Sequence, residues 1–283
     1  MAAATAEGPA EVTATGLDHG APAGDRRARL LGWLEAGLVV ALLGWLVLQG
    51  ALALDYRWQW YRVWPYLVVA DAHGLRAGPL LQGLLVTLAL CGWSFLGMLA
   101  CGIAAAVLQL VPSFTGRLLA RAYVELVRNT PLLVQLYLLY FVAAPVLRLD
   151  RFVAGVVALS LFEGAYAAEI VRAGILAVPA GQREAAMALG LSAWLRWRLV
   201  ILPQALRSMI PPLAGQVVLL VKHSALVSVL AIAELTTAGR NLIADTFLSF
   251  EIWFTVAAIY LALTITLSAL AAWLERRCRP ARS

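Results

Sequence analysis

The sequence predicts an all-α polytopic membrane protein with about six transmembrane helices. Of its 283 residues, 62% are hydrophobic and 13% are charged, whereas soluble domains carry about 25% charged residues. A spanning helix needs about 20 predominantly apolar residues, and six segments of this chain reach that length. They are residues 30–54, 80–111, 119–145, 152–176, 209–232 and 251–274.

The chain begins with a region that is too polar to enter a bilayer. Residues 1–29 are rich in Ala, Gly and Pro, so we expect them to form a disordered tail. Residues 30–79 are expected to hold the first transmembrane helix and a segment that lies at the membrane surface. The surface segment, residues 55–67, reads "DYRWQWYRVWPYL". Its clustered Trp and Tyr side chains favour the membrane–water interface.

The third apolar segment is interrupted by three residues, Asn129, Thr130 and Pro131. Proline removes a backbone donor and bends or breaks a helix. This point is therefore either a simple kink or a place where Thr130 and backbone carbonyls face a cavity on the substrate pathway. Just before it, Glu125 and Arg128 stand three residues apart on one helix face, which predicts a local ion pair.

Two charges lie near the middle of predicted spans, Glu163 in the fourth and Lys222 in the fifth. Ionisable groups at that depth are costly and are candidates for function. One alternative is a substrate pathway in which Glu163 faces a cationic group and Lys222 an anionic group of the cargo. Ser160, one turn before Glu163, and Ser224, next but one to Lys222, would line the same pathway. The other alternative is a Glu163–Lys222 pair that only fixes helix packing.

Cysteine and histidine show no pattern typical of a metal site. Cys91 and Cys101 lie within one apolar segment without CxxC spacing. His19, His73 and His223 are far apart in the sequence, so we expect them to be isolated polar residues. We expect no metal and no cofactor on this chain. The net charge of +6 is spread over a hydrophobic chain and does not indicate a nucleic-acid partner.

Arginine placement predicts the orientation of the helices, because cytoplasmic loops carry an excess of Lys and Arg. One side receives fourteen arginines, in the tail, the 111–121 loop, the 172–207 region and the C-terminus. The other side receives six. Both termini, including the basic tail 276–283, are therefore expected to lie in the cytoplasm.

The loop between the fourth and fifth spans, residues 177–207, contains the stretch "EAAMALGLSAWLRWRLVILP". It is too polar to span. Gly190 can end a short helix, Ser192 is suited to cap a second one, and Pro203 is expected to limit that second helix. Physical chemistry alone leaves two alternatives for this element, an amphipathic helix on the lipid headgroups or a docking surface for a protein.

The same loop resembles a signature of ABC-importer membrane subunits. The pattern is EAA, three residues, Gly, nine residues, an aliphatic residue, one residue, and Leu-Pro. It falls on Glu184, Ala185, Ala186, Gly190, Val200, Leu202 and Pro203. The flanking stretches "YVELVRNTPLLVQLYLLYF" and "AYAAEIVRAGILAVPAGQ" are similar to the branch of these permeases that carries polar amino acids. The resemblance covers residues 80–275.

The resemblance implies a type I ABC-importer permease core and a set of partners. A second permease subunit, identical or related, would pair with this chain in the bilayer of a bacterial cytoplasmic (inner) membrane. Two ATPase subunits would bind the loop 177–207, and an extracytoplasmic solute-binding protein would deliver the amino acid. The chain has no phosphate-binding G-x-x-x-x-G-K loop, so ATP would be used by the partner subunits and the chain itself is not expected to be an enzyme.

Two other classes of function are less well supported. A secondary amino-acid transporter would work without an ATPase, and many such folds carry two related halves. Such a repeat is not visible in this sequence. A membrane enzyme would need a catalytic set, and no Ser/His/Asp or paired-carboxylate arrangement stands out.

Overall fold

The computed structural model describes residues 24–53, 56–71 and 74–278. It falls into two units, residues 1–58 and 59–283, and each is described by itself. The first unit contains helix α1, Gly24–Ala53. Residues 24–29, expected in the tail, are therefore helical, while residues 1–23 lie outside the described part. Residues 31–46 of α1 are exposed all round. A helix of this kind suits a lipid environment.

The second unit opens with short elements that the sequence did not predict. A 3₁₀ turn η1 (Trp60–Arg62) and helix α2 (Trp64–Leu67) lead into an antiparallel hairpin of β1 (Val68–Asp71) and β2 (Gly74–Ala77). The backbone N–H of Gln59 donates to the buried carboxylate of Glu251 at 2.7 Å. This bond ties the segment to the last long helix. An interfacial position for its Trp and Tyr side chains stays a prediction.

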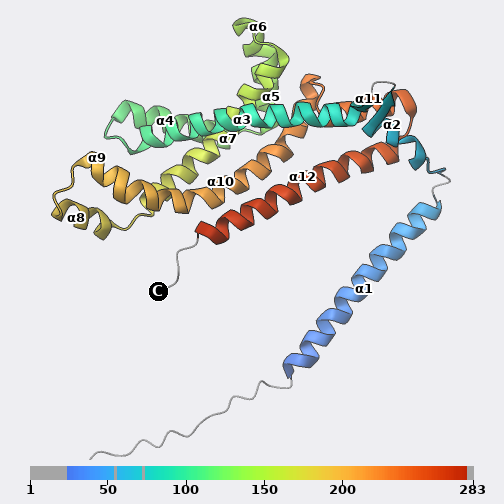
Figure 1. Cartoon of the computed structure of the whole chain (residues 1–283), viewed down its shortest axis with the longest axis horizontal. Coiled ribbons are helices and arrows are strands. Elements are labelled where there is room, and N and C mark those ends of the chain that lie inside the picture. Colours follow the sequence, from blue (N-terminus) through green and yellow to red (C-terminus); the bar gives the residue numbers. More distant parts are fainter. Residues whose placement is uncertain (1–23, 54–55, 72–73, 279–283) are drawn as a thin grey trace, which may run out of the picture. The chain divides into compact units, whose positions relative to one another are not determined.

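A bundle of long helices makes up most of the second unit (Figure 1). Its members are α3 (Pro79–Leu110), α7 (Arg151–Leu176), α10 (Leu202–Ser224) and α12 (Ser249–Cys278). Helices α3 and α7 approach closely. A Cβ on Gly102 would lie 2.7 Å from the Cβ of Ala167, so only glycine allows this spacing. The four helices confirm the predicted apolar spans around residues 80–111, 152–176, 209–232 and 251–274.

The third predicted span is not one continuous helix. Helix α4 (Phe114–Arg128) ends at Asn129, and α5 (Leu132–Tyr137), the π-helix η2 (Leu138–Ala143) and α6 (Ala144–Leu147) continue at an angle of 108°. Pro131 lacks the donor that would continue α4. Within the described residues, five helices are long and apolar enough to span a membrane, or six if this bent pair counts as one span.

Side chains satisfy the carbonyls that the break would otherwise leave open. The Thr130 hydroxyl donates to the carbonyl of Leu126 at 2.8 Å. The Gln135 amide donates to the carbonyls of Val127 and Thr130 at 2.7 and 3.0 Å. The interruption is therefore a capped break, and these carbonyls are not left open toward a cavity.

Pro203 does not end the helix that precedes the fifth span. Helix α9 (Ala193–Leu195) passes through the π-helix η3 (Arg196–Ile201) directly into α10. The wider π-helical turn lies where proline removes a donor and its ring crowds the preceding turn. The expectation that Pro203 limits the helix is therefore wrong. A long, continuous helix instead joins the loop to the bundle.

The far end of the bundle is closed by the 3₁₀ segment η4 (Ala225–Leu230) and helix α11 (Leu235–Thr246). Glu234, which is fully buried, caps α11 by accepting from the backbone N–H groups of Thr236 and Thr237 at 2.7 Å each. The Tyr260 hydroxyl donates to the same carboxylate at 3.1 Å. This cap fixes α11 against α12. Figure 1 shows α11 and α2 at one end of the bundle and α8 and α9 at the other.

Candidate functional site

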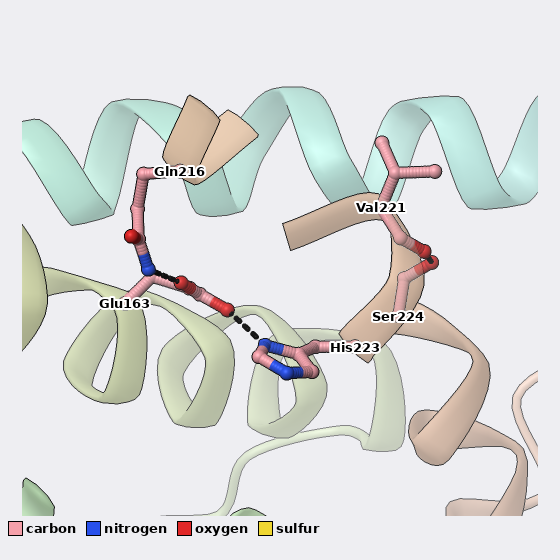
Figure 2. A network of polar contacts seen from close by, with 5 residues as sticks. All are labelled: Glu163, Gln216, Val221, His223 and Ser224. Carbon is pink, nitrogen blue, oxygen red and sulfur yellow. Dashed lines mark hydrogen bonds and ion pairs between the residues drawn. The ribbon is translucent and has the colours of Figure 1, made fainter. Parts of the chain in front are cut away.

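Glu163 is a fully buried carboxylate near the middle of α7. Two side chains from α10 reach it (Figure 2). The Gln216 amide donates to Oε2, and the His223 Nδ1 lies 2.5 Å from Oε1. Gln216 and His223 are seven residues apart, which places them on one face of an α-helix, two turns from each other. Both carboxylate oxygens are therefore held by one helix face.

His223 is the only one of these three side chains with substantial exposure. Its side chain is 31% exposed, whereas that of Glu163 is 0% exposed. With Glu163 in its ionised form, which only accepts hydrogen bonds, Nδ1 is the donor in this contact. The other ring nitrogen, Nε2, then remains for a further partner. Phe162 packs edge-on against the imidazole at 5.5 Å between ring centroids and holds its orientation.

Lys222 does not pair with Glu163. Neighbouring residues on an α-helix point about 100° apart, and the side chain on the Glu163 side is that of His223 while Lys222 is exposed. The alternative of a Glu163–Lys222 pair is therefore wrong, and so is the expectation that His223 is an isolated polar residue. Sequence reasoning also missed Gln216. The signal was present, because two polar residues at i and i+7 interrupt an apolar span.

The three hydroxyl residues predicted on the pathway are each bonded to a backbone carbonyl. Ser160 donates to the carbonyl of Ser94 at 3.4 Å, and Ser224 donates within its own helix to the carbonyl of Val221 at 2.7 Å. Thr130 caps the break after α4. Ser160 and Ser224 are buried. The structure brings Glu163, Gln216 and His223 together, and none of these three hydroxyls joins that network.

Glu125 and Arg128 likewise do not form the expected local ion pair. Glu125 Oε2 accepts from the amide of Asn129 at 3.1 Å, and the Arg128 guanidinium lies over the ring of Tyr166 at 5.5 Å. The ion pair found in this region is Arg172–Glu169 at 2.9 Å, between residues three apart on α7.

The loop 177–207 contains helix α8, Ala180–Ala188, followed by a tight turn. Gly190 has a φ of +71°, a left-handed conformation that favours glycine. The N–H of Leu191 donates to the carbonyl of Ala186 at 3.2 Å, and the N–H of Gly190 donates to that of Met187 at 2.9 Å. These two bonds form a Schellman motif. Gly190 therefore ends α8 as predicted.

The second helix of the loop also begins where the sequence predicts. The Ser192 hydroxyl accepts from the backbone N–H of Leu195 at 3.4 Å. The loop is attached to the bundle through Arg183, whose guanidinium donates to the carbonyl of Ile175 near the end of α7 at 2.7 Å. A guanidinium in this position caps the helix and favourably opposes its dipole. This hydrogen bond fixes the loop to the C-terminal end of α7.

The signature residues of the loop differ in exposure. Ala186 is buried, whereas Glu184, Ala185, Gly190, Leu202 and Pro203 are exposed. Large apolar side chains are exposed beside them: Met187, Leu189, Trp194 and Leu199. An apolar surface around a charged residue, held on a rigid element, suits docking against another surface.

Comparisons with known proteins agree with this architecture. The family "Binding-protein-dependent transport system inner membrane component" matches residues 98–280. The glutamine transport system permease protein GlnP of Escherichia coli is 37% identical over 227 residues, which cover 79% of this chain and 99% of that protein. The octopine transport system permease protein OccM of Rhizobium radiobacter is 38% identical over 56% of this chain and 71% of that protein.

Solved structures show the same fold. An amino acid ABC transporter crystallised with histidines has a chain that is 38% identical, with a TM-score of 0.66, over 70% of this chain and 94% of that one. The inward-facing MetNI methionine ABC transporter is 20% identical with a TM-score of 0.63, over 71% and 97%, and this likeness supports the fold alone. With its apolar helices, its family match and these relatives, the chain belongs to the inner-membrane permease subunits of binding-protein-dependent ABC transport systems.

Proposed function

We propose that this chain is the permease subunit of an ATP-driven importer of amino acids. The observation that carries the proposal is its 37% identity to a glutamine permease over 99% of that protein's length. Members of this family work with ATPase subunits and a solute-binding protein. The secondary-transporter alternative gains no support from any relative reported above.

The family and the arginine distribution support the following proposed arrangement of partners. Two ATPase subunits would sit on the cytoplasmic side, and a second permease subunit would complete the path through the bacterial cytoplasmic membrane. The solute-binding protein would dock on the opposite side. Both termini and the loop 177–207 would then face the cytoplasm, because the arginine excess lies with them.

The loop 177–207 would be the surface that receives the ATPase. Glu184 and the exposed apolar side chains around it would enter a groove on the partner. The capped turn at Gly190 and the contact of Arg183 with α7 make the element stiff. A stiff element passes movement of the ATPase to α7 and, through the continuous η3–α10 helix, to Gln216 and His223.

The Glu163 network would contact the cargo in the membrane. Glu163 holds His223 from behind, so the exposed imidazole would present Nε2 toward a bound amino acid. Lys222 lies on another, exposed face of α10, so this proposed contact does not include it. When the bundle rearranges, the ammonium or guanidinium of the cargo would compete with Gln216 and His223 for the carboxylate.

A co-purification experiment tests the proposed assembly. The tagged chain is expressed together with the ATPase and the solute-binding protein, and the complex is isolated in nanodiscs. We expect the ATPase to co-purify and its activity to rise severalfold when the loaded binding protein is added. A chain that purifies without the ATPase under these conditions would contradict the proposal.

Labelling of single cysteines tests the proposed orientation. In a variant with Cys91, Cys101 and Cys278 replaced by alanine, cysteines are introduced at Ala193 in α9 and at Asn241 in α11, which are both exposed. The two helices lie at opposite ends of the bundle (Figure 1). We expect the cysteine at 241 to react with an impermeant thiol reagent in intact cells. The one at 193 should react only after the membrane is opened, and the reverse pattern would show that the orientation is inverted.

A further inference from the structure

A polar cavity of about 390 Å³ lies at the end of the bundle that leads into the loop 177–207. It is formed by the last turn of α3, one face of α4 and the last turns of α7. Its polar lining consists of Gln109, Arg121, Glu125, Arg128, Glu169 and Arg172. The volume falls in the range of about 300–1,000 Å³ that is typical of small-molecule sites.

Helical spacing explains why these charges converge. On α4, Arg121, Glu125 and Arg128 stand at i, i+4 and i+7, so they share one face. On α7, Glu169 and Arg172 stand at i and i+3 and form the ion pair described above. The two faces meet across the cavity and place three guanidinium groups beside two carboxylates.

Some hydrogen-bond donors in the lining of this cavity have no acceptor. Among the described residues, the shielded atoms Gln109 Nε2 and Arg172 Nε have no hydrogen-bond partner. A shielded donor without a partner destabilises the folded protein. A ligand with acceptor oxygens would remove this destabilisation. The lining therefore offers donors that the chain's own side chains do not satisfy.

The mixture of charges selects the class of ligand. A ligand that is only anionic would be repelled by Glu125 and Glu169, and a ligand that is only cationic would be repelled by the three arginines. A molecule that carries a negative and a positive charge within a few ångströms of each other can pair with the arginines and with the glutamates at the same time. We propose that this cavity binds the α-carboxylate and α-ammonium of an amino acid, a second binding site in addition to the Glu163 network. This inference rests on the proposed transport function and on the orientation proposed with it.

The cavity is joined to the Glu163 network by a continuous wall of side chains. The ring of Phe162, which touches His223, packs on Tyr166 at 5.2 Å between centroids. Tyr166 in turn lies under the guanidinium of Arg128. Glu169 follows Glu163 by six residues, about 9 Å along α7 toward the loop. An amino acid that leaves Glu163 toward the loop would therefore reach this cavity next.

The consequence is inhibition by the product. An amino acid that occupies the cavity from the cytoplasmic side would hold α4 and α7 together and slow the next cycle. The carboxylate is bound by charge-assisted hydrogen bonds to Arg121, Arg128 and Arg172, and the ammonium by Glu125 and Glu169.

Uptake by proteoliposomes preloaded with amino acid tests this inference. The full complex is reconstituted with ATP inside and the loaded binding protein outside, so that the vesicle lumen represents the cytoplasm. Initial uptake of labelled L-glutamine, and in parallel of L-arginine and L-glutamate, is measured against the luminal concentration of the same amino acid. Each variant is normalised to its own uptake with an empty lumen.

We expect luminal amino acid to inhibit the unmodified transporter. Arg121→Gln and Glu125→Gln, on exposed positions of α4, should each raise the luminal concentration for half-inhibition about tenfold. Arg121→Lys should retain most of the inhibition. Arg117→Gln, one turn away on the same helix and outside the cavity lining, is the matched control and should behave like the unmodified protein. If either cavity variant fails to assemble, the other, of opposite charge, still gives the answer.

Three outcomes would overturn the inference. They are uptake that luminal amino acid does not inhibit, cavity variants that respond like Arg117→Gln, and inhibition that follows the phosphatidylethanolamine content of the vesicles without responding to amino acid. The last outcome would assign the cavity to a zwitterionic lipid headgroup. Absence of any ATP-driven uptake is a different result and would instead contradict the proposed function.

Discussion

Glu163→Gln is expected to lower ATP-driven uptake about tenfold or more while the subunit still inserts and assembles. The substitution keeps the shape of the side chain but turns one of its two acceptor oxygens into a donor. The new amide N–H would then face a donor of Gln216 or of His223, so one of these two hydrogen bonds is lost. A hydrogen bond to a charged group contributes about 1.5–3 kcal/mol, which corresponds to about one to two orders of magnitude in an equilibrium. Uptake per assembled complex, with the amount of complex determined by size-exclusion chromatography, is the measurement.

Two further variants separate a functional role of Glu163 from a packing role. Lys222→Met removes a neighbouring charge that makes no contact with Glu163, so its assembly should be unchanged. Glu163→Gln combined with His223→Gln replaces the network by neutral amides. If Glu163 only holds the helices together, the double variant should recover much of the uptake. We expect it to assemble and remain impaired. If Glu163→Gln alone assembles normally and keeps full uptake, both roles of Glu163 are contradicted.

Gly190→Val is expected to uncouple the transporter. A β-branched residue at a φ of +71° is strained, at a cost of about 1–3 kcal/mol. The chain can avoid this strain only by giving up the turn between α8 and α9. A Cβ at this position meets no atom within 4 Å, so the effect comes from backbone strain and not from a clash. ATPase activity stimulated by the loaded binding protein should fall severalfold, and co-purification of the ATPase should weaken.

Gly181→Val is the matched control, because it makes the same change in the same element. Gly181 is exposed in α8, also has no atom within 4 Å of a Cβ, and shows no left-handed φ. Its ATPase stimulation should stay close to that of the unmodified protein. Equal behaviour of the two variants would show that the capped turn does not matter for coupling.

Much of the fold follows from elementary patterns in the sequence. Continuous runs of about 20 apolar residues predict α3, α7, α10 and α12. Such a run must form a helix, because inside a bilayer the backbone N–H and C=O groups have to hydrogen-bond within the segment. Local rules are equally informative in the loop. Gly190 takes the left-handed position after α8, and Ser192 caps α9, since both depend on a few neighbouring residues.

The effect of proline was harder to predict. Pro131 breaks a span by 108°, whereas Pro203 is accommodated by a π-helix and Pro211 and Pro212 lie inside α10. The outcome depends on whether nearby side chains and packing can satisfy the freed carbonyls. The sequence does not show which carbonyls Gln135 and Thr130 will reach.

The partner of Glu163 could not be predicted from depth in the membrane. Lys222 and His223 lie at nearly the same depth, and the helical phase of α10 relative to α7 decides which of them points to the carboxylate. That phase is set by close packing between the helices. A Cβ on Gly174, for example, would lie 2.3 Å from Cγ of Met209 on α10. Tertiary contacts of this kind are not visible in the periodicity of a single segment.

The central claim is that this chain moves amino acids only as part of an ATP-driven complex, and uptake by reconstituted proteoliposomes tests it most directly. The permease is reconstituted with and without its ATPase, with ATP inside and loaded solute-binding protein outside. We predict uptake of labelled amino acid that requires the ATPase and ATP, and that persists when ionophores collapse the proton and sodium gradients. Uptake by the permease alone, driven by an ion gradient and indifferent to ATP, would contradict the claim.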